Sequence, residues 1–120
     1  MFDIIFYRDK RGFSAIQEFL DDLHSRYNTS KHDRINFDKI MAFLEILEKE
    51  GVSIGHPIVR HIRGDIWELR PLDNRVLFFF WKDNKYVLLH HFMKKTNKTP
   101  PQEIRKAQNN LDDYIERHGK

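Results

Sequence analysis

The sequence predicts an α+β fold built from an N-terminal strand, a helical hairpin, a three-stranded antiparallel meander and a C-terminal helix. Apolar residues recur at helical spacing in two stretches between residues 14 and 51. Three β-prone runs follow between residues 65 and 93, and helical spacing returns after residue 99. No repeat or Pro/Gly/Ser-rich linker divides the 120 residues, so we expect one domain, residues 1–120.

The first expected elements are a strand and a helix. FDIIFY, residues 2–7, is a short apolar, β-prone run that ends at the polar turn RDKRG. Ser14 and Gln17 have the spacing of a capping box, and apolar residues recur at helical spacing to about Tyr27.

A second helix and an ordered loop follow. The sequence NTSKH, residues 28–32, interrupts the helical spacing, which resumes at Phe37 and stops at Gly51, a common C-terminal stop. We expect the two helices to form a hairpin. Residues 52–64 have no regular period and predict an ordered loop with room for one short strand.

The second half of the chain predicts a meander and a last helix. The expected strands are residues 65–70, 75–82 and 85–93, separated by the turn-rich sequences PLDN and DN. Thr99 is the expected N-cap of the last helix, since prolines follow it, and the apolar face continues to Gly119.

The two turns set the expected strand register. A two-residue loop at DN pairs Lys82 with Lys85, and the PLDN turn pairs Arg70 with Arg75. The resulting pairs include Phe80–Val87, Phe78–Leu89 and Val76–His91. One face then holds the residues that we expect to pack against the helices: Trp67, Leu69, Val76, Phe78, Phe80, Val87, Leu89 and Met93. The opposite face holds Glu68, Arg70, Arg75, Leu77, Phe79, Trp81, Tyr86, Leu88, His90, Phe92 and Lys94. A one-residue slip in either turn reverses these faces.

Cations border the second face. Arg70, Arg75, His90 and Lys94, with Glu68 beside them, are expected to form a cationic cluster near aromatic side chains. Such a cluster suits phosphate oxygens and stacked bases. The alternative interpretation is that these strand-end charges are solvated and prevent edge pairing.

Three aromatic side chains of this face would be exposed to solvent unless another element packs over them. Phe79, Trp81 and Tyr86 are expected to be covered either by a helix or strand of a partner protein or by the terminal helix of the chain.

Composition narrows the function classes. The formal net charge of +3 permits a nucleic-acid partner without requiring one, and the lack of cysteine excludes disulfides and Cys-based zinc sites. We find no secretory leader and no apolar run long enough to cross a membrane, so we expect a cytoplasmic protein. His90 and His91 point to opposite strand faces, and we expect no metal or other cofactor.

The sequences WELRP, RVLFFF, LLHHFMKKTNKTP and EIRKA, with FYRDKRGFSAIQEFL near the start, resemble the RelE/HigB superfamily of type II toxin–antitoxin toxins, notably its phage-derived HigB-like branch. The resemblance covers nearly the whole chain and implies a RelE-like fold. It also implies a metal-independent endoribonuclease, an mRNA interferase that cleaves messenger RNA on the ribosome and inhibits translation. A cognate antitoxin would hold it inactive. In such enzymes the 2′-hydroxyl of the RNA attacks the adjacent phosphate, and the protein mainly supplies positive charge.

The resemblance also assigns residues. Arg75 matches the strand arginine beside the scissile phosphate, and Arg70 matches a second basic position of the motif. Lys95 matches a basic residue near the phosphate, whereas the face pattern favours Lys94, so both are candidates.

The chain departs from the family pattern at the general base. Some relatives have lysines where this chain has Ile66 and Glu68. Certain relatives also have a tyrosine in the last helix as a candidate base, and the corresponding position in this chain is near Pro101. His90 or Glu68 is therefore the candidate for accepting the 2′-hydroxyl proton.

Three further residues are candidates for RNA contact. His61 and Arg63 lie in the loop before the meander, where they would meet ribosomal RNA or remain solvated, and Phe92 lies on the cationic face.

Two other functions remain open at this point. The same scaffold supports ParE-like gyrase inhibitors, and it also permits a noncatalytic module that binds nucleic acid or protein. Cleavage of translated RNA distinguishes the nuclease from both, and DNA supercoiling distinguishes the other two.

Overall fold

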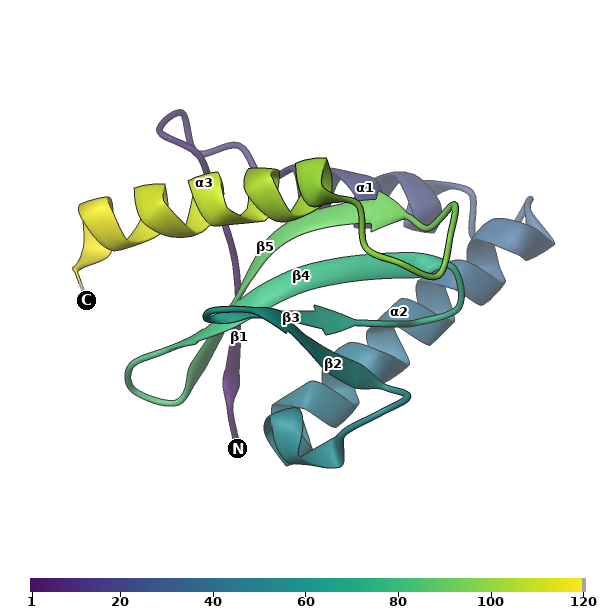
Figure 1. The fold of residues 1–120 in the computed structure, drawn as a ribbon. Helices are drawn as coiled ribbons and strands as arrows, with labels where there is room; N and C mark the ends of the chain where they lie inside the picture. Colours follow the sequence, from purple (N-terminus) through teal and green to yellow (C-terminus); the bar gives the residue numbers. More distant parts are fainter. Residues whose placement is uncertain (120) are drawn as a thin grey trace.

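A computed structural model describes residues 1–119 of the chain as a five-stranded sheet with helices on both faces (Figure 1). The elements in chain order are β1 (Asp3–Phe6), α1 (Ala15–Ser25), α2 (Lys31–Glu50), the 3₁₀ helix η1 (Gly51–Ile54), β2 (Val59–Arg63), β3 (Ile66–Leu69), β4 (Asn74–Trp81), β5 (Lys85–Met93) and α3 (Pro101–His118). The sheet order is β1-β5-β4-β3-β2, with β1 parallel to β5 and the other neighbours antiparallel. The predicted α+β architecture is confirmed. Within residues 1–119, no helix combines the length and apolar character that a membrane span requires.

The helix boundaries follow local capping. Ser14 caps α1 as expected, because its hydroxyl accepts a hydrogen bond from the Gln17 N–H at 3.1 Å. The second helix begins earlier than Phe37, since the Ser30 hydroxyl accepts from the Asp33 N–H at 3.2 Å and starts α2 within NTSKH. Gly51 ends α2 as expected, at a φ of 64°.

The segment that was expected to be mostly loop adds a strand to the sheet. Residues 52–64 include part of η1 and all of β2, which pairs antiparallel with β3. The pairing has an irregularity between His61 and Arg63. The sheet therefore extends one strand beyond the predicted meander on this side.

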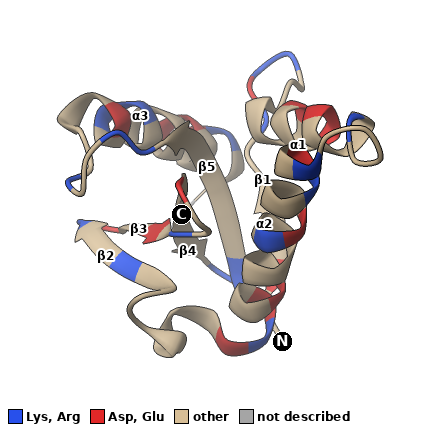
Figure 2. Cartoon of the chain, turned by 90° about the vertical axis from the view of Figure 1, so that its right-hand side faces the viewer, with Lys and Arg blue, Asp and Glu red and all other residues tan. Residues whose placement is uncertain are grey.

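Two hydrophobic cores hold the layers together, and in Figure 2 the sheet lies between α3 and the α1–α2 pair. The core under α1 and α2 contains the buried residues Ile16, Leu20, Leu23, Ile40, Leu44, Leu47, Val59, Leu69, Val76, Phe78, Tyr86 and Leu88. The core under α3 contains Ile66, Leu77, Phe79, Val87, Leu89, Ile104, Ala107, Leu111 and Tyr114. Both faces of the sheet are thus covered by the chain itself.

The β4–β5 turn differs from the predicted two-residue loop. Trp81 pairs with Lys85, so the turn has three residues, of which Asp83 and Asn84 have left-handed φ values of 61° and 58°. Short polar residues tolerate this conformation because their side chains bond the local backbone. The expected Lys82–Lys85 pair is therefore wrong, and so are the Phe80–Val87 and Phe78–Leu89 pairs that depended on it.

An irregularity in the ladder restores the register further along. Phe78 pairs with Leu88, but its neighbour Leu77 pairs with His90, so Leu89 is the extra residue of a bulge. The expected Val76–His91 pair is confirmed. The two shifts cancel, and the end of β5 keeps the predicted face.

The turn shift moves several β5 side chains to the other face. Val87 and Leu89 lie in the core under α3, whereas Tyr86 and Leu88 lie under α1 and α2, opposite to the prediction. Phe80 and Met93 were expected in the core but are 49% and 45% exposed. Phe80 is the residue before the last of β4, and Met93 is the last residue of β5.

The terminal helix packs over two of the three aromatic residues for which the sequence permits either a partner protein or this helix. The Phe79 and Trp81 rings meet the Tyr114 ring of α3 edge-on, with centroids 6.0 and 5.0 Å apart. Tyr86 instead packs against Phe2 on the other face, at 5.0 Å. Residues of the chain itself therefore cover these three aromatic side chains, which was the second of the two alternatives; the first was a helix or strand of a partner protein.

Candidate functional site

A buried carboxylate lies at the centre of the candidate site. Glu68, on β3, is fully buried and faces the α3 side of the sheet, where it pairs with Leu77 of β4. Its Oε2 accepts a hydrogen bond from the Thr99 hydroxyl at 2.6 Å, and its Oε1 accepts one from Arg60 Nη2 at 3.2 Å. A buried carboxylate requires such partners, because an unpaired charge away from water is strongly unfavourable.

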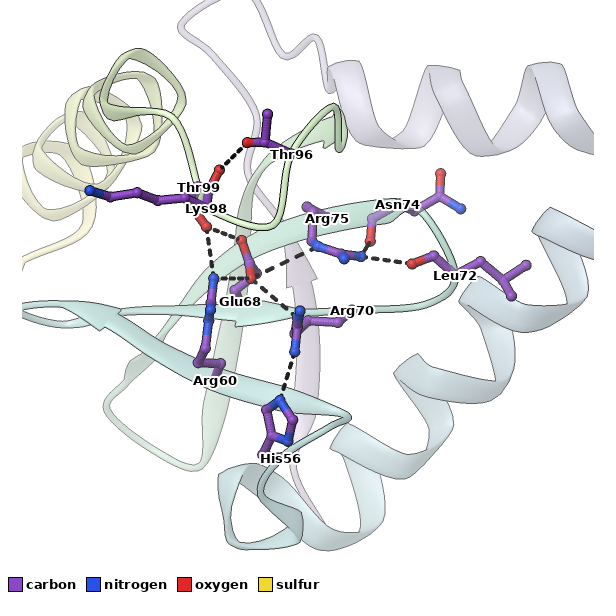
Figure 3. A network of polar contacts seen from close by, with 10 residues as sticks. All are labelled: His56, Arg60, Glu68, Arg70, Leu72, Asn74, Arg75, Thr96, Lys98 and Thr99. Atoms are coloured by element: carbon purple, nitrogen blue, oxygen red, sulfur yellow. Dashed lines mark hydrogen bonds and ion pairs between the residues drawn. The ribbon is translucent and has the colours of Figure 1, made fainter.

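Three arginines surround this carboxylate, and we call Arg60, Arg70 and Arg75 the arginine cluster (Figure 3). Their nearest side-chain nitrogen atoms lie 3.2, 3.5 and 4.0 Å from Glu68 Oε1, respectively. Strand register brings them together: Arg60 on β2 pairs directly with Glu68, and the other two flank the β3–β4 turn. Three guanidinium groups share one carboxylate, so the cluster carries excess positive charge.

Arg75 is the most enclosed member of the cluster, at 6% exposure. Its Nη1 donates to the carbonyl oxygens of Leu72 and Asn74, each at 2.8 Å. Burial and the nearby charge of Arg70 lower the pKa of Arg75, and Glu68 partly offsets this effect. Arginine nevertheless stays charged at neutral pH, so the site holds a cation in a fixed orientation.

The other two arginines are more open. Arg70 Nη1 lies 2.9 Å from His56 Nε2, which accepts its hydrogen bond. Within the described part of the chain, the buried Nε atoms of Arg60 and Arg70 make no hydrogen bond. These two atoms are enclosed, but the Arg60 side chain is 37% exposed, so an external oxygen atom can reach this member of the cluster.

The loop from Lys94 to Pro100 carries three lysines past the cluster. The Lys94 N–H donates to the Asp73 carbonyl at 2.8 Å, which anchors the start of this loop beside the β3–β4 turn. Lys94 is half-buried, while Lys95 and Lys98 are exposed. Both predicted lysines therefore lie on a segment that is tied to the site, and Lys95 is the freer of the two.

A hollow of about 340 Å³ lies between β2 and the start of α3. It is lined by Arg60, His61, Ile62, Arg63, Lys98, Thr99, Pro101 and Ile104. Two candidate RNA contacts, His61 and Arg63, line this hollow with Arg60, but the His61 ring packs edge-on against Trp67, on the α1–α2 side of the sheet. Figure 2 shows basic positions on β2 and on the loop that leads into α3.

His90 lies on the same side of the sheet as the cluster but bonds to α3. Its Nε2 is 2.6 Å from Glu103 Oε1, and its ring stacks near Phe92, with centroids 6.0 Å apart. Burial raises the pKa of Glu103, but the hydrogen bond to His90 and the nearby Lys106 outweigh it, and the net shift is downward. Glu103 is therefore the acceptor of this bond, and His90 Nε2 carries the proton.

His91 points to the opposite face, as predicted. Its ring stacks on Phe19 of α1 with centroids 3.9 Å apart, and its Nε2 lies 3.1 Å from Asn74 Oδ1. Burial and the adjacent His90 lower the pKa of His91 to about 4. Across residues 1–119, no three His, Asp or Glu side chains gather as a metal site would require.

Sequence reasoning missed two members of the site. Arg60 falls in the segment predicted as a loop, because VRHIR at residues 59–63 lacks strict apolar–polar alternation; its β-branched Val59 and Ile62 favour a strand, but only the observed register places Arg60 opposite Glu68. Thr99 was expected to cap α3, but Pro100 is at the N-cap without a side-chain bond. We find no sequence signal that would have connected Thr99 with Glu68.

Comparison with protein families identifies a relationship for most of the chain. A family model described as "Phage derived protein Gp49-like (DUF891)" matches residues 29–112. The matched region runs from α2 into α3 and contains the whole arginine cluster, Glu68 and the lysine-bearing loop. No curated protein matches the chain.

Proposed function

The chain belongs to the Gp49-like family of phage-derived proteins, a RelE/HigB-type toxin family of toxin–antitoxin systems, and from this premise we propose that it is a ribosome-dependent endonuclease of messenger RNA. In this proposal the ribosome presents the messenger RNA in the cytoplasm, cleavage inhibits translation, and a cognate antitoxin restrains the toxin. The RelE/HigB-like motifs of the chain support the finer assignment.

The observation that carries the proposal is the arginine cluster, held by one buried carboxylate. When the 2′-oxygen of RNA attacks the adjacent phosphorus, negative charge builds on the phosphoryl oxygens. The bond to the 5′-oxygen then breaks, leaving a 2′,3′-cyclic phosphate and a 5′-hydroxyl. Cations fixed in advance stabilise this charge without reorganising, and this is a large contribution to catalysis.

We assign phosphate contact to Arg75 and Arg70, with Lys95 and Lys94 as further cations beside the scissile group. Glu68 is fully buried and accepts hydrogen bonds from Thr99 and Arg60. This enclosure favours a role in positioning the cluster over one in proton transfer.

His90 is then the proposed acceptor of the 2′-hydroxyl proton. Its bond to Glu103 holds a proton on Nε2, which leaves Nδ1 as the nitrogen that would accept the 2′-hydroxyl proton. The hollow beside the cluster supports assigning His61 and Arg63 to RNA contact, and Phe92, stacked near His90, is the proposed base platform.

The deciding experiment incubates a labelled messenger RNA with the protein, with and without translating ribosomes. We expect cuts that require translation, are lost with Arg75→Ala and persist with Arg8→Ala, which removes an exposed arginine bonded to the Gly12 carbonyl. Circular dichroism establishes that each variant is folded. Absence of cuts by folded wild type would overturn the proposal, and a supercoiling assay would then distinguish gyrase inhibition from noncatalytic binding.

A further inference from the structure

The Thr99 hydroxyl is bound to the site and not to the helix that follows it. Threonine just before a helix commonly accepts a hydrogen bond from the N–H groups of the first turn. Here Pro100 is at the N-cap of α3 without a side-chain bond, while Thr99 is 8% exposed with Oγ1 2.6 Å from Glu68 Oε2. These two residues are 31 positions apart in the chain, so the bond joins separate elements.

The same hydroxyl also contacts the arginine cluster. Arg60 Nη2 lies 3.2 Å from Thr99 Oγ1, as well as 3.2 Å from Glu68 Oε1. A hydroxyl has one proton and can accept in addition, so Thr99 donates to the carboxylate and accepts from the guanidinium. It therefore fixes both charged groups relative to the loop.

The loop that Thr99 ends is the lysine-bearing segment. Its start is held by the Lys94 N–H on the Asp73 carbonyl, and its end by Thr99 on Glu68. Lys95 and Lys98 lie between these points and are exposed. The Thr99 bond thus sets how this loop passes the arginine cluster (Figure 3).

We infer that Thr99 is a positioning residue of the proposed RNA-cleavage site: its hydroxyl holds Glu68 and Arg60 in place and fastens the lysine-bearing loop against the arginine cluster. This inference rests on the proposed function. Thr99 acts through its neighbours, and the RNA phosphate meets the cations that it orders.

The test compares variants that remove or keep the hydroxyl. Thr99→Val keeps the shape, Thr99→Ala removes the group without added bulk, and Thr99→Ser keeps the donor. Thr96→Val is the matched control, since the exposed Thr96 hydroxyl in the same loop donates to the Lys98 carbonyl at 3.0 Å.

We expect Thr99→Val and Thr99→Ala to lower kcat for ribosome-dependent cleavage by at least about tenfold with a smaller change in KM, because a hydrogen bond to a charged group is lost. Thr99→Ser and Thr96→Val should remain within about twofold of wild type, the scale of a negligible free-energy change. Unchanged kcat in folded Thr99→Val or Thr99→Ala, or an equal loss in Thr99→Ser, would overturn the inference.

A second readout separates this inference from the proposed function. The Nε–H resonances of the arginine side chains report by NMR on the order of each guanidinium without any RNA. We expect a sharp, slowly exchanging Arg60 signal in wild type and Thr99→Ser, and a broadened one in Thr99→Val and Thr99→Ala. A folded Val or Ala variant with an unchanged Arg60 signal would refute positioning by Thr99. Wild type that does not cleave RNA would refute the nuclease, whatever the NMR result.

Discussion

Arg75 donates from Nη1 to the carbonyl oxygen of Leu72 at 2.8 Å, across the turn between β3 and β4. Leu72 has a φ of 56°, a left-handed conformation that residues with a side chain rarely adopt. The turn backbone therefore follows an uncommon path that presents a carbonyl to the arginine. Because the Asn74 carbonyl accepts from the same nitrogen, the guanidinium orientation is fixed from the backbone side.

This geometry predicts that lysine cannot replace Arg75. Arg75→Lys keeps one positive charge but loses the planar guanidinium group. A lysine cannot donate to the carbonyl oxygens of the turn and at the same time approach Glu68. We expect ribosome-dependent cleavage to fall by about 100-fold, similar to the loss of one preorganised donor of transition-state charge. Single-turnover rates on translated RNA measure the effect, with Arg8→Lys at an exposed position as the control. Full activity of Arg75→Lys would mean that charge alone suffices.

Glu68→Gln should destabilise the fold, because it leaves the three arginines without their shared countercharge. Removing one partner of a buried ionic group is strongly unfavourable, and we expect the free energy of unfolding to fall by about 3 kcal/mol. Urea denaturation at neutral pH measures this change. Added phosphate should recover part of the loss, because an anion can bind the uncompensated guanidinium groups.

The control for this prediction is Glu45→Gln. Glu45 pairs with Lys49 on the exposed side of α2, at 2.9 Å. Solvent screens an exposed pair of this type, so we expect Glu45→Gln to change the free energy of unfolding far less than Glu68→Gln. Equal effects of the two substitutions would contradict the central role assigned to Glu68.

The lowered pKa of His91 predicts that the folded protein loses stability in mild acid. Its pKa is lowered from 6.5 to about 4 in the folded protein, so the unfolded chain binds more protons between these values. The stability that this neutral histidine provides is therefore complete above pH 6.5 and is lost as the pH falls toward 4. Between pH 7 and pH 5 we expect a loss of about 2 kcal/mol from this residue.

The matched variant is His91→Gln, whose amide can still donate to Asn74 Oδ1 but does not titrate. Urea denaturation of both proteins at pH 7 and pH 5 isolates the contribution of His91, since the other titrating groups are unchanged. The variant should lose about 2 kcal/mol less than wild type over this interval. Parallel pH dependences would show that His91 does not titrate in this way.

The face that carries the candidate site could be predicted, although part of the register could not. The register predicted from the PLDN turn is correct for β3 and β4, since Leu69 pairs with Val76, as the expected Arg70–Arg75 pairing requires. The DN turn shifts the neighbouring hairpin by one residue, and the bulge at Leu89 reverses the shift before His90. A bulge depends on packing between layers, which local sequence does not encode.

The remaining parts of the site depend on contacts between distant residues. Arg60 reaches Glu68 because β2 joins the sheet, and Thr99 reaches it from the loop before α3. Capping rules are local and favour a hydroxyl bonded to its own helix. In this protein a buried carboxylate is the stronger acceptor, so the tertiary contact overrides the local preference.

Gly51 provides a final prediction, about the joint between α2 and the sheet. It has a φ of 64° and ψ of −161°, a combination that is essentially restricted to glycine. A Cβ at this position would lie 2.8 Å from the Tyr86 hydroxyl oxygen and 2.9 Å from a ring carbon of Phe2. That hydroxyl accepts the Val52 N–H at 3.1 Å, so moving it would break a tertiary hydrogen bond. We expect Gly51→Ala to lower the free energy of unfolding by at least about 3 kcal/mol, from strain and overpacking together.

Gly55→Ala is the matched control, because Gly55 has nearly the same backbone conformation, φ 71° and ψ −169°, but a Cβ there meets only the Ser53 carbonyl oxygen, at 4.0 Å. The variant has the backbone strain without the clash, and we expect a loss of about 2 kcal/mol. Urea denaturation of the two variants therefore separates conformational strain from packing. If both lose the same stability, the close approach of α2 to Tyr86 contributes nothing beyond the backbone conformation. A larger loss at Gly51 would establish that close packing of Phe2 and Tyr86 fixes the end of α2 against the sheet.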